Sequence, residues 1–292
     1  MSETSNGLGN DSIGLEMATS ASVATNAFPY ANLENTVNNA HFARGYVLPN
    51  RPIEHVMHKG GVCNIVENNV YNARMTYNAD PNVSFEFDIQ STATDGKFII
   101  WHNNNTDTML DKNIEVQTST FEELRALRFK GLVGTPYYNQ VKLSTLDEWC
   151  EFLAQVNRSF YPEIKRFQTL DQVTQMVKLV KSYGLSKLAT WENGKLDVLQ
   201  HVRSIDPDVR VGYLDFYEEG QNLDDSIKKM QDIGNGVILW QINNLTKEKV
   251  QKVHDAGVGL CGWTASNNVT YIKAIDMGLT TITCDYKPSF KF

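Results

Sequence analysis

The chain has 292 residues, 41% of them apolar, and its 27 basic and 34 acidic side chains give a net charge of -7. This is enough for one large domain with a substantial core, and single α/β barrels commonly reach ~250 residues. The acidic balance argues against a nucleic-acid partner, because phosphate backbones are bound by clustered Lys and Arg. The four cysteines form no C-x-x-C pair, so neither a zinc knuckle nor a disulfide framework is indicated.

The first fifty residues differ in composition from the rest. Residues 1–50 are rich in Ser, Thr, Ala and Asn and carry few charges, and such a segment buries little apolar surface alone. We predict an irregular arm over 1–50 and a folded domain over 51–292. The arm is either a flexible extension or an attachment segment that orders against a larger assembly or another copy of the chain. Phe28, Tyr30, Phe42 and Tyr46 would supply its apolar contacts.

The beginning of the chain has neither the basic nor the apolar region of a secretory signal peptide. No apolar run reaches the ~18 residues that a membrane span needs. We therefore expect synthesis in the cytoplasm and no membrane span.

From residue 53 onward, β-branched or aromatic runs alternate with helical patterns, which predicts βα units and a parallel sheet. Strands are predicted at 53–58, 84–89, 98–102, 160–165, 188–191, 210–214, 236–240, 260–264 and 280–284. Helices are predicted at 67–77, 120–127, 145–156, 169–183, 195–204, 223–232, 246–255 and 267–277. About eight strands with about eight helices favour a (β/α)8 TIM barrel over an open sheet, with 98–102 in a short hairpin insertion after the second strand.

Polar side chains fall where the first predicted strands end. His58 ends the first strand and His102 ends the 98–102 run, while Glu86 and Asp88, two residues apart, share one face of the second strand. In a parallel barrel, functional groups gather at the C-terminal ends of the strands. An unpaired carboxylate in a buried strand costs several kcal/mol, which favours metal ligation over an exposed face. Taken alone, His102 is better interpreted as a core histidine.

Later strands continue this pattern. Glu163 and Lys165 are a second i, i+2 pair, which by itself fits a salt bridge equally well. Trp263 lies near the end of the seventh barrel strand and Asp285 ends the eighth, although Asp285 also fits a simple turn out of a strand. The rim of the predicted barrel therefore carries candidate metal ligands, proton carriers and an ammonium group.

Together these segments resemble the glycerophosphodiester phosphodiesterase family of phospholipase C-like barrels. The resemblance covers about residues 53–288, and the ordered set is more specific than any one motif. The matching segments are His58-Lys59-Gly60, Glu67-Asn68-Asn69, Glu86-Phe87-Asp88, residues 95–103, Thr145-Leu146-Asp147-Glu148, Glu163-Ile164-Lys165, Trp263-Thr264 and residues 284–288.

The resemblance implies hydrolysis of a glycerophosphodiester to an alcohol and glycerol phosphate. It implies one divalent cation on Glu86, Asp88 and Glu163, with His58 and His102 as the acid/base pair. An all-carboxylate ligand set suits Ca²⁺ or Mg²⁺. We assign contacts to the phosphate or the rest of the substrate to Lys59, Lys165, Glu67, Asn68 and Trp263.

The sequence departs from the family pattern beside both histidines. Lys59 replaces the family's arginine, which keeps the charge but loses two-pronged phosphate binding. Asn103 replaces an aspartate, residues 104–108 replace the usual Leu-x-Arg-Thr-Thr stretch, and Thr190-Trp191 replaces Ser-Phe. These changes concern the substrate more than the reaction.

Two other functions remain open. A sphingomyelinase D-like phospholipase shares the early His and E-x-D pattern, but Glu163-Ile164-Lys165 and the lack of a signal peptide and disulfide pattern argue against it. The barrel could instead be a cell-surface-binding structural component, for example of a bacteriophage tail, that binds or cuts a glycerophosphate polymer such as teichoic acid. Catalysis is favoured because no histidine or metal ligand is missing.

Overall fold

The protein is represented by a computed structural model, which describes residues 53–61, 66–93, 96–215 and 222–285. The predicted arm at 1–50 and the motif residues 286–288 lie outside these ranges, so the domain boundary at residue 51 stays a prediction. No helix within the described ranges is long and apolar enough to cross a membrane.

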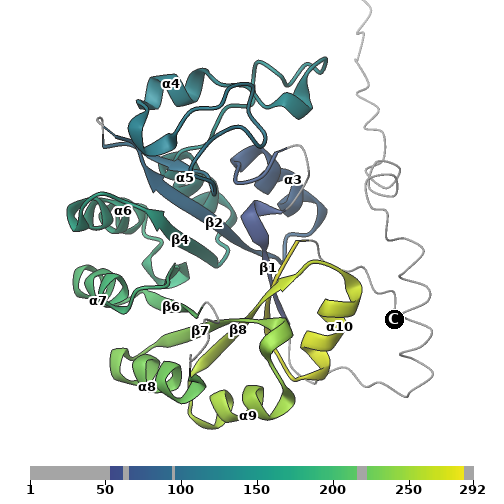
Figure 1. Ribbon diagram of the computed structural model, residues 1–292, viewed down its shortest axis with the longest axis vertical. Helices are drawn as coiled ribbons and strands as arrows, with labels where there is room; N and C mark the ends of the chain where they lie inside the picture. Colours follow the sequence, from purple (N-terminus) through teal and green to yellow (C-terminus); the bar gives the residue numbers. More distant parts are fainter. Residues whose placement is uncertain (1–52, 62–65, 94–95, 216–221, 286–292) are drawn as a thin grey trace, which may run out of the picture. The chain divides into compact units, whose positions relative to one another are not determined.

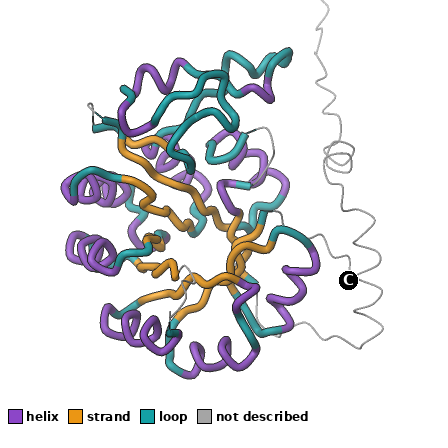
Figure 2. The backbone as a smooth tube through the Cα atoms, in the orientation of Figure 1, coloured by secondary structure: helices purple, strands orange, loops and turns teal. Residues whose placement is uncertain are grey.

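Among the described residues, eight parallel strands close into a barrel, because β1 pairs with both β2 and β9. Figure 2 shows these strands gathered inside the surrounding helices. The barrel strands are β1 (Glu54–Met57), β2 (Ser84–Ser91), β4 (Phe160–Arg166), β5 (Thr190–Asn193), β6 (Arg210–Asp215), β7 (Gly236–Gln241), β8 (Gly259–Ala265) and β9 (Thr281–Cys284). The prediction of a (β/α)8 TIM barrel is confirmed.

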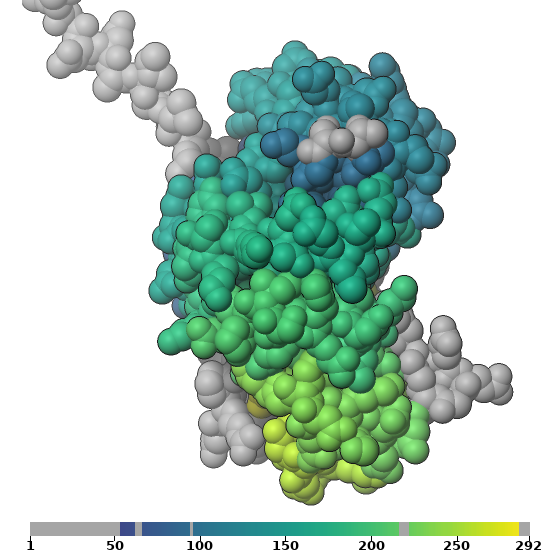
Figure 3. Space-filling view, turned by 90° about the vertical axis from the view of Figure 1, so that its left-hand side faces the viewer, coloured from purple at the N-terminus to yellow at the C-terminus, as the bar shows by residue number. Residues whose placement is uncertain are grey.

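Helices connect successive strands on the outside of the barrel (Figure 1). They are α3 (Val70–Ala79), α5 (Leu146–Val156), α6 (Leu170–Ser182), α7 (Leu196–Ile205), α8 (Leu223–Ile233), α9 (Lys247–Asp255) and α10 (Asn268–Asp276). In Figure 3 the coloured surface runs from blue through green to yellow, because consecutive βα units lie side by side. Thr145 caps α5 and Thr246 caps α9. Each threonine side chain accepts a hydrogen bond from a backbone N–H in the first turn, which fixes where the helix begins.

Several predicted boundaries shift by one or more residues, and two of these shifts bear on the site. The helix predicted from residue 67 begins at Val70, because Asn68 takes a left-handed backbone (φ 55°) and the Asn69 side chain caps the helix at Tyr71 N. The strand predicted at 188–191 lies at Thr190–Asn193, because Ser186–Leu188 form a short 3-10 helix. This second shift brings Glu192 into the barrel wall.

Strand β2 shows how the sequence positions the site. All eight of its residues are buried, and from Ser84 to Gln90 polar side chains alternate with Phe or Ile. Phe87 stacks on Trp149 of α5 with ring centroids 4.2 Å apart, so the apolar set faces the helix layer. Period-two alternation then directs Glu86 and Asp88 toward the barrel interior.

The insertion after β2 is larger than the predicted hairpin. Strand β3 (Phe98–Ile100) pairs antiparallel with β2, as expected. Beyond it lie α4 (Phe121–Ala126) and short 3-10 helices at Val116–Thr118 and Lys130–Leu132. This lobe has its own apolar core, to which Trp101, Leu110, Val116, Leu124, Phe129 and Leu143 contribute.

Candidate active site

Three carboxylates meet inside the barrel. Asp88 of β2 lies directly opposite Glu163 of β4, and one oxygen each from Glu86, Asp88 and Glu163 can be chosen so that all lie within 4.8 Å of one another. Glu86 is 4% exposed and Asp88 is 1% exposed. Burial of so much like charge is unfavourable unless a cation or hydrogen bonds compensate it. The donor set is all oxygen and could hold one hard divalent cation.

The carboxyl pKa values reflect this crowding. Burial, with repulsion from Asp88, raises the pKa of Glu86 to about 7 and that of Glu163 to about 8. Burial also acts to raise the pKa of Asp88, but the positive charges of Lys165 and His102 bring it below its ordinary value. The cluster therefore holds a shared negative charge that a cation would stabilise.

Lys165 and Asn68 hold the cluster in place. Lys165 Nζ lies 2.9 Å from Glu163 Oε1 and 3.5 Å from Asp88 Oδ1. Asn68 Nδ2 donates to Asp88 Oδ2 at 2.8 Å, and Asp88 N donates to Asn68 Oδ1 at 3.0 Å. The structure thus places Asn68 against a candidate metal ligand, where it fixes the carboxylate.

His58 lies in a tight 3-10 turn, His58–Gly60, that directly follows β1. Gly60 has φ 77°, and a Cβ there would lie 2.9 Å from Trp149 Cη2, so glycine allows the turn to pack closely. The turn brings Lys59 N to Glu86 Oε2, to which it donates at 2.7 Å. His58 Nδ1 donates to Asp285 Oδ1 at 2.8 Å, and His58 Nε2 lies 3.9 Å from Glu86 Oε2.

His102 follows β3 by two residues. Its Nδ1 donates to Asn103 Oδ1 at 2.8 Å, and Arg166 Nη1 donates to its carbonyl at 3.1 Å. Asn103, a departure from the family pattern, therefore still supplies an acceptor for the ring, but a neutral one.

The two histidine pKa values shift in opposite directions. Burial acts to lower the pKa of His58, but the Asp285 hydrogen bond and the negative charge of Glu86 raise it above 6.5. Burial lowers the pKa of His102 below 6.5, and the attraction of Asp88 does not offset it. A charged partner at one ring and a neutral partner at the other contribute to this difference.

One cavity of about 200 Å³ brings the predicted groups together. One wall is charged and the other includes the apolar side chains Leu214 and Leu239 beside Trp263. The predicted site residues in the lining are His58, His102, Glu86, Glu163, Lys59, Lys165 and Trp263. Glu67 is not in the lining; it forms an ion pair with Lys59 Nζ at 2.9 Å and reaches the cavity only through that lysine.

Sequence reasoning assigned no role to two further residues at this site. Asp285 is the hydrogen-bond partner of His58, and its signal was its place at the end of the last barrel strand. Glu192 also lines the cavity, and it lies directly opposite Glu163 in the β4–β5 pairing. Its only signal was a carboxylate one residue beyond a predicted strand.

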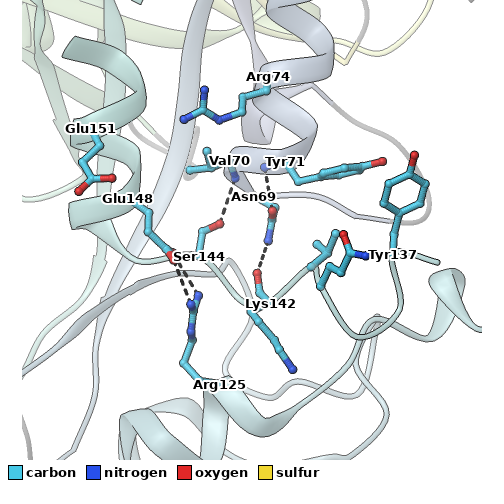
Figure 4. Close-up of a pocket in the computed structure, with 12 residues that line it drawn as sticks. Asn69, Val70, Tyr71, Arg74, Arg125, Tyr137, Lys142, Ser144, Glu148 and Glu151 are labelled. Carbon is cyan, nitrogen blue, oxygen red and sulfur yellow. Dashed lines mark hydrogen bonds and ion pairs between the residues drawn. The ribbon is translucent and has the colours of Figure 1, made fainter. Parts of the chain in front are cut away.

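A second, larger groove of about 390 Å³ lies beside α3, α5 and the insertion lobe (Figure 4). It is lined by charged, amide and tyrosine side chains, among them Arg125, Glu148, Tyr71 and Tyr137. None of the candidate site residues predicted from the sequence lines this groove. Seven of the predicted site residues therefore line the smaller cavity, and none lines the groove.

Comparison with solved structures shows the same fold. A putative glycerophosphoryl diester phosphodiesterase from Silicibacter pomeroyi is 21% identical, with a TM-score of 0.69 over 82% of this chain and 91% of that one. A phosphodiesterase from Oleispira antarctica, solved with sn-glycerol-3-phosphate, is 18% identical, with a TM-score of 0.70 over 82% and 94%. A putative enzyme from Galdieria sulphuraria is 20% identical, with a TM-score of 0.67 over 81% and 94%.

No curated protein sequence matches the chain significantly. The model of the glycerophosphoryl diester phosphodiesterase family matches residues 58–287, a segment that begins at His58 and spans both histidines, the acidic cluster and Asp285. The chain therefore belongs to this family and is a glycerophosphodiester phosphodiesterase.

Proposed function

We propose that the protein hydrolyses small glycerophosphodiesters to an alcohol and glycerol phosphate, using one Ca²⁺ or Mg²⁺ ion and two histidines. The observation that carries the proposal is that both histidines and the acidic cluster lie at one cavity. Glu86, Asp88 and Glu163 would hold the cation, which when bound neutralises and orients a phosphate oxygen. Lys59 and Lys165 add positive charge to the cavity wall for the phosphate.

The hydrogen bonds of the two rings suit proton transfer. In each histidine Nδ1 donates to a protein acceptor, Asp285 for His58 and Asn103 for His102. This leaves Nε2 of each ring to exchange a proton with the substrate. One ring then acts as base and the other as acid, which is the division that bond making and bond breaking at phosphorus require.

In the first step, one histidine accepts the proton of the substrate's own glycerol hydroxyl as that oxygen bonds to phosphorus. The bond from phosphorus to the leaving alcohol breaks, and the other histidine protonates the leaving oxygen. The products are a free alcohol and a cyclic glycerol phosphate. Water then opens the ring with the histidine roles reversed, which gives glycerol phosphate. The product bound to the Oleispira antarctica enzyme supports this product assignment.

The test measures glycerol phosphate release from glycerophosphocholine by wild type, His58→Ala and His102→Ala, with and without EDTA. We expect each substitution to lower kcat/KM by ~10²- to 10⁴-fold, since a positioned acid or base contributes that much. EDTA should abolish wild-type activity, and added Ca²⁺ or Mg²⁺ should restore it. Wild-type rates from either variant would contradict the two-histidine mechanism.

A glycerophosphate polymer such as teichoic acid is the extended version of this substrate. The volume of about 200 Å³ would suit one glycerol phosphate unit, and the rest of a polymer would then lie outside the cavity. Residues 1–50 would then attach the enzyme to a larger assembly that acts at a cell surface. Product analysis with glycerophosphocholine and with poly(glycerol phosphate) separates the two substrates: polymer cleavage to glycerol phosphate supports the extended proposal, and an inert polymer excludes it.

A further inference from the structure

Glu192 is a buried carboxyl that the mechanism above does not use. It lies on β5, opposite Glu163 on one side and Gly212 of β6 on the other. It is 2% exposed, and its Oε1 accepts a hydrogen bond from none of the described residues. A buried polar atom without a partner is unfavourable by about 1–3 kcal/mol. A group that carries this cost and that also borders a cavity fits a role in binding a ligand.

The neighbouring strand leaves space for this side chain. A Cβ on Gly212 would lie 2.5 Å from Leu239 Cδ1 and 3.4 Å from Glu192 Cγ. Any larger residue at 212 would therefore compress Leu239 and crowd Glu192. Because Gly212 has no side chain, the Glu192 carboxyl and the Leu239 side chain both fit in the barrel interior beside it. Both residues line the cavity.

Glu192 also lies at the border between two kinds of surface. The acidic cluster comes from β2 and β4, on one side of β5. Leu214, Leu239 and Trp263 come from β6, β7 and β8, on the other side. An alcohol whose phosphate is bound at the charged wall would lay its carbon chain on the apolar wall and reach Glu192 with a terminal polar group.

We propose that Glu192 binds the terminal hydroxyl of the glycerol moiety, the hydroxyl that takes no part in the bond changes at phosphorus. The inference rests on the proposed function and names the residue that selects its alcohol. A hydroxyl is the fitting partner because it donates to a carboxyl oxygen, and Oε1 lacks a donor. The cavity of about 200 Å³ holds one small alcohol beside a phosphate.

The test compares two substrates that differ only in this hydroxyl. Glycerophosphocholine carries it, whereas the phosphocholine ester of 1,2-propanediol keeps the hydroxyl that attacks phosphorus and lacks the terminal one. Both release choline, so any contact with the leaving group cancels in their ratio. We expect wild type to favour glycerophosphocholine by roughly 10- to 100-fold in kcat/KM, the effect of one hydrogen bond to a buried polar group.

Substitutions at Glu192 test whether its side chain causes this preference. Glu192→Leu removes both carboxyl oxygens at similar size, and Glu192→Gln keeps an acceptor. In Glu192→Leu we expect kcat/KM for the two substrates to agree within about three-fold, chiefly because KM for glycerophosphocholine rises. Glu192→Gln should retain part of the preference for glycerophosphocholine. Asp206→Asn is the matched control: Asp206 is equally buried but precedes β6, at the opposite end from the cavity. Its substrate ratio should equal that of wild type.

A binding measurement makes the result independent of turnover. Isothermal titration of cation-loaded wild type and Glu192→Leu with glycerol 3-phosphate and with 1,2-propanediol 1-phosphate should show the same loss of preference. Equal rates on both substrates by wild type would overturn the role of Glu192 and leave the proposed function intact. An unchanged ratio in Glu192→Leu, with both rates lowered alike, would show a structural role instead. Failure of wild type to cleave or bind either compound would refute both proposals.

Discussion

The cavity inside the barrel and the groove beside the insertion lobe differ in how completely their polar side chains are paired, and the smaller of the two is the less completely paired. The groove between α3, α5 and the insertion lobe measures about 390 Å³, against about 200 Å³ for the cavity inside the barrel. In the groove, Arg125 forms a two-pronged ion pair with Glu148, with N–O distances of 3.1 and 3.0 Å. Figure 4 also shows Asn69 donating to the Lys142 carbonyl and Val70 N donating to Ser144. These charged and polar groups of the groove are paired within the protein.

The smaller cavity lacks this balance. Glu86 and Glu163 carry raised pKa values in a crowded cluster, and Glu192 Oε1 has no donor among the described residues. Unbalanced buried charge is unfavourable for folding, and it is where a cation and a substrate gain most on binding. Buried polar groups that are incompletely paired, rather than volume, distinguish the candidate active site from the groove.

The largest effect is expected from the substitution Asp88→Asn. It removes one charge from the acidic cluster and leaves a side chain of the same size next to Asn68. We expect a loss of at least roughly 10³-fold in kcat/KM, since a bound cation supplies several kcal/mol to the reaction. Elemental analysis of chelated and reloaded protein should show less bound metal than in wild type. Full metal content with full activity would contradict the assignment of Asp88 as a ligand.

A second test uses the pH dependence of stability in chelated protein. The pKa of a glutamate in the unfolded chain is 4.5, whereas the pKa values of folded Glu86 and Glu163 are about 7 and about 8. Between these values the folded state binds more protons, so stability should fall as the pH rises from about 5 to about 8, by ~1.4 kcal/mol per unit of pKa shift. His58, with its raised pKa, acts in the same direction above 6.5, and His102 acts in the opposite direction below it.

Urea unfolding at several pH values checks this prediction, with EDTA or with excess Ca²⁺ or Mg²⁺. We expect a decline of a few kcal/mol in EDTA and a much smaller one with the cation, which stabilises the ionised cluster. Stability that rises with pH in the chelated protein would show that the carboxyls are already compensated within the fold.

The smallest effect is expected at the larger groove. Arg125→Met breaks the ion pair with Glu148, whose carboxyl would still cap α5 at Thr145 N. We expect unchanged kcat/KM, within about two-fold, and a loss of about 1 kcal/mol in stability, typical of a well-formed but partly exposed ion pair. Activity assays and urea unfolding measure both. A ten-fold loss of activity in a stably folded variant would make the groove part of the substrate site.

Much of the candidate active site could be predicted because strand periodicity is a local property. Glu86 and Asp88 share one face of a buried strand, and His58 directly follows β1. Neither position depends on how the rest of the barrel folds. Glu67 and Asn68 were harder to predict, because both belong to the loop before α3. Their side chains contact Lys59 and Asp88 rather than line the cavity.

The sequence alone predicted the alternating strands and helices and the closed barrel, since these follow from apolar periodicity, and its resemblance to the family supplied the set of candidate ligands. Only the tertiary structure decided that Asp285 is the hydrogen-bond partner of His58 and that Glu192 lines the cavity. Asp285 and His58 are 227 residues apart, and strand pairing around the closed barrel brings them together. Such partners depend on barrel closure and on register, which no local pattern contains.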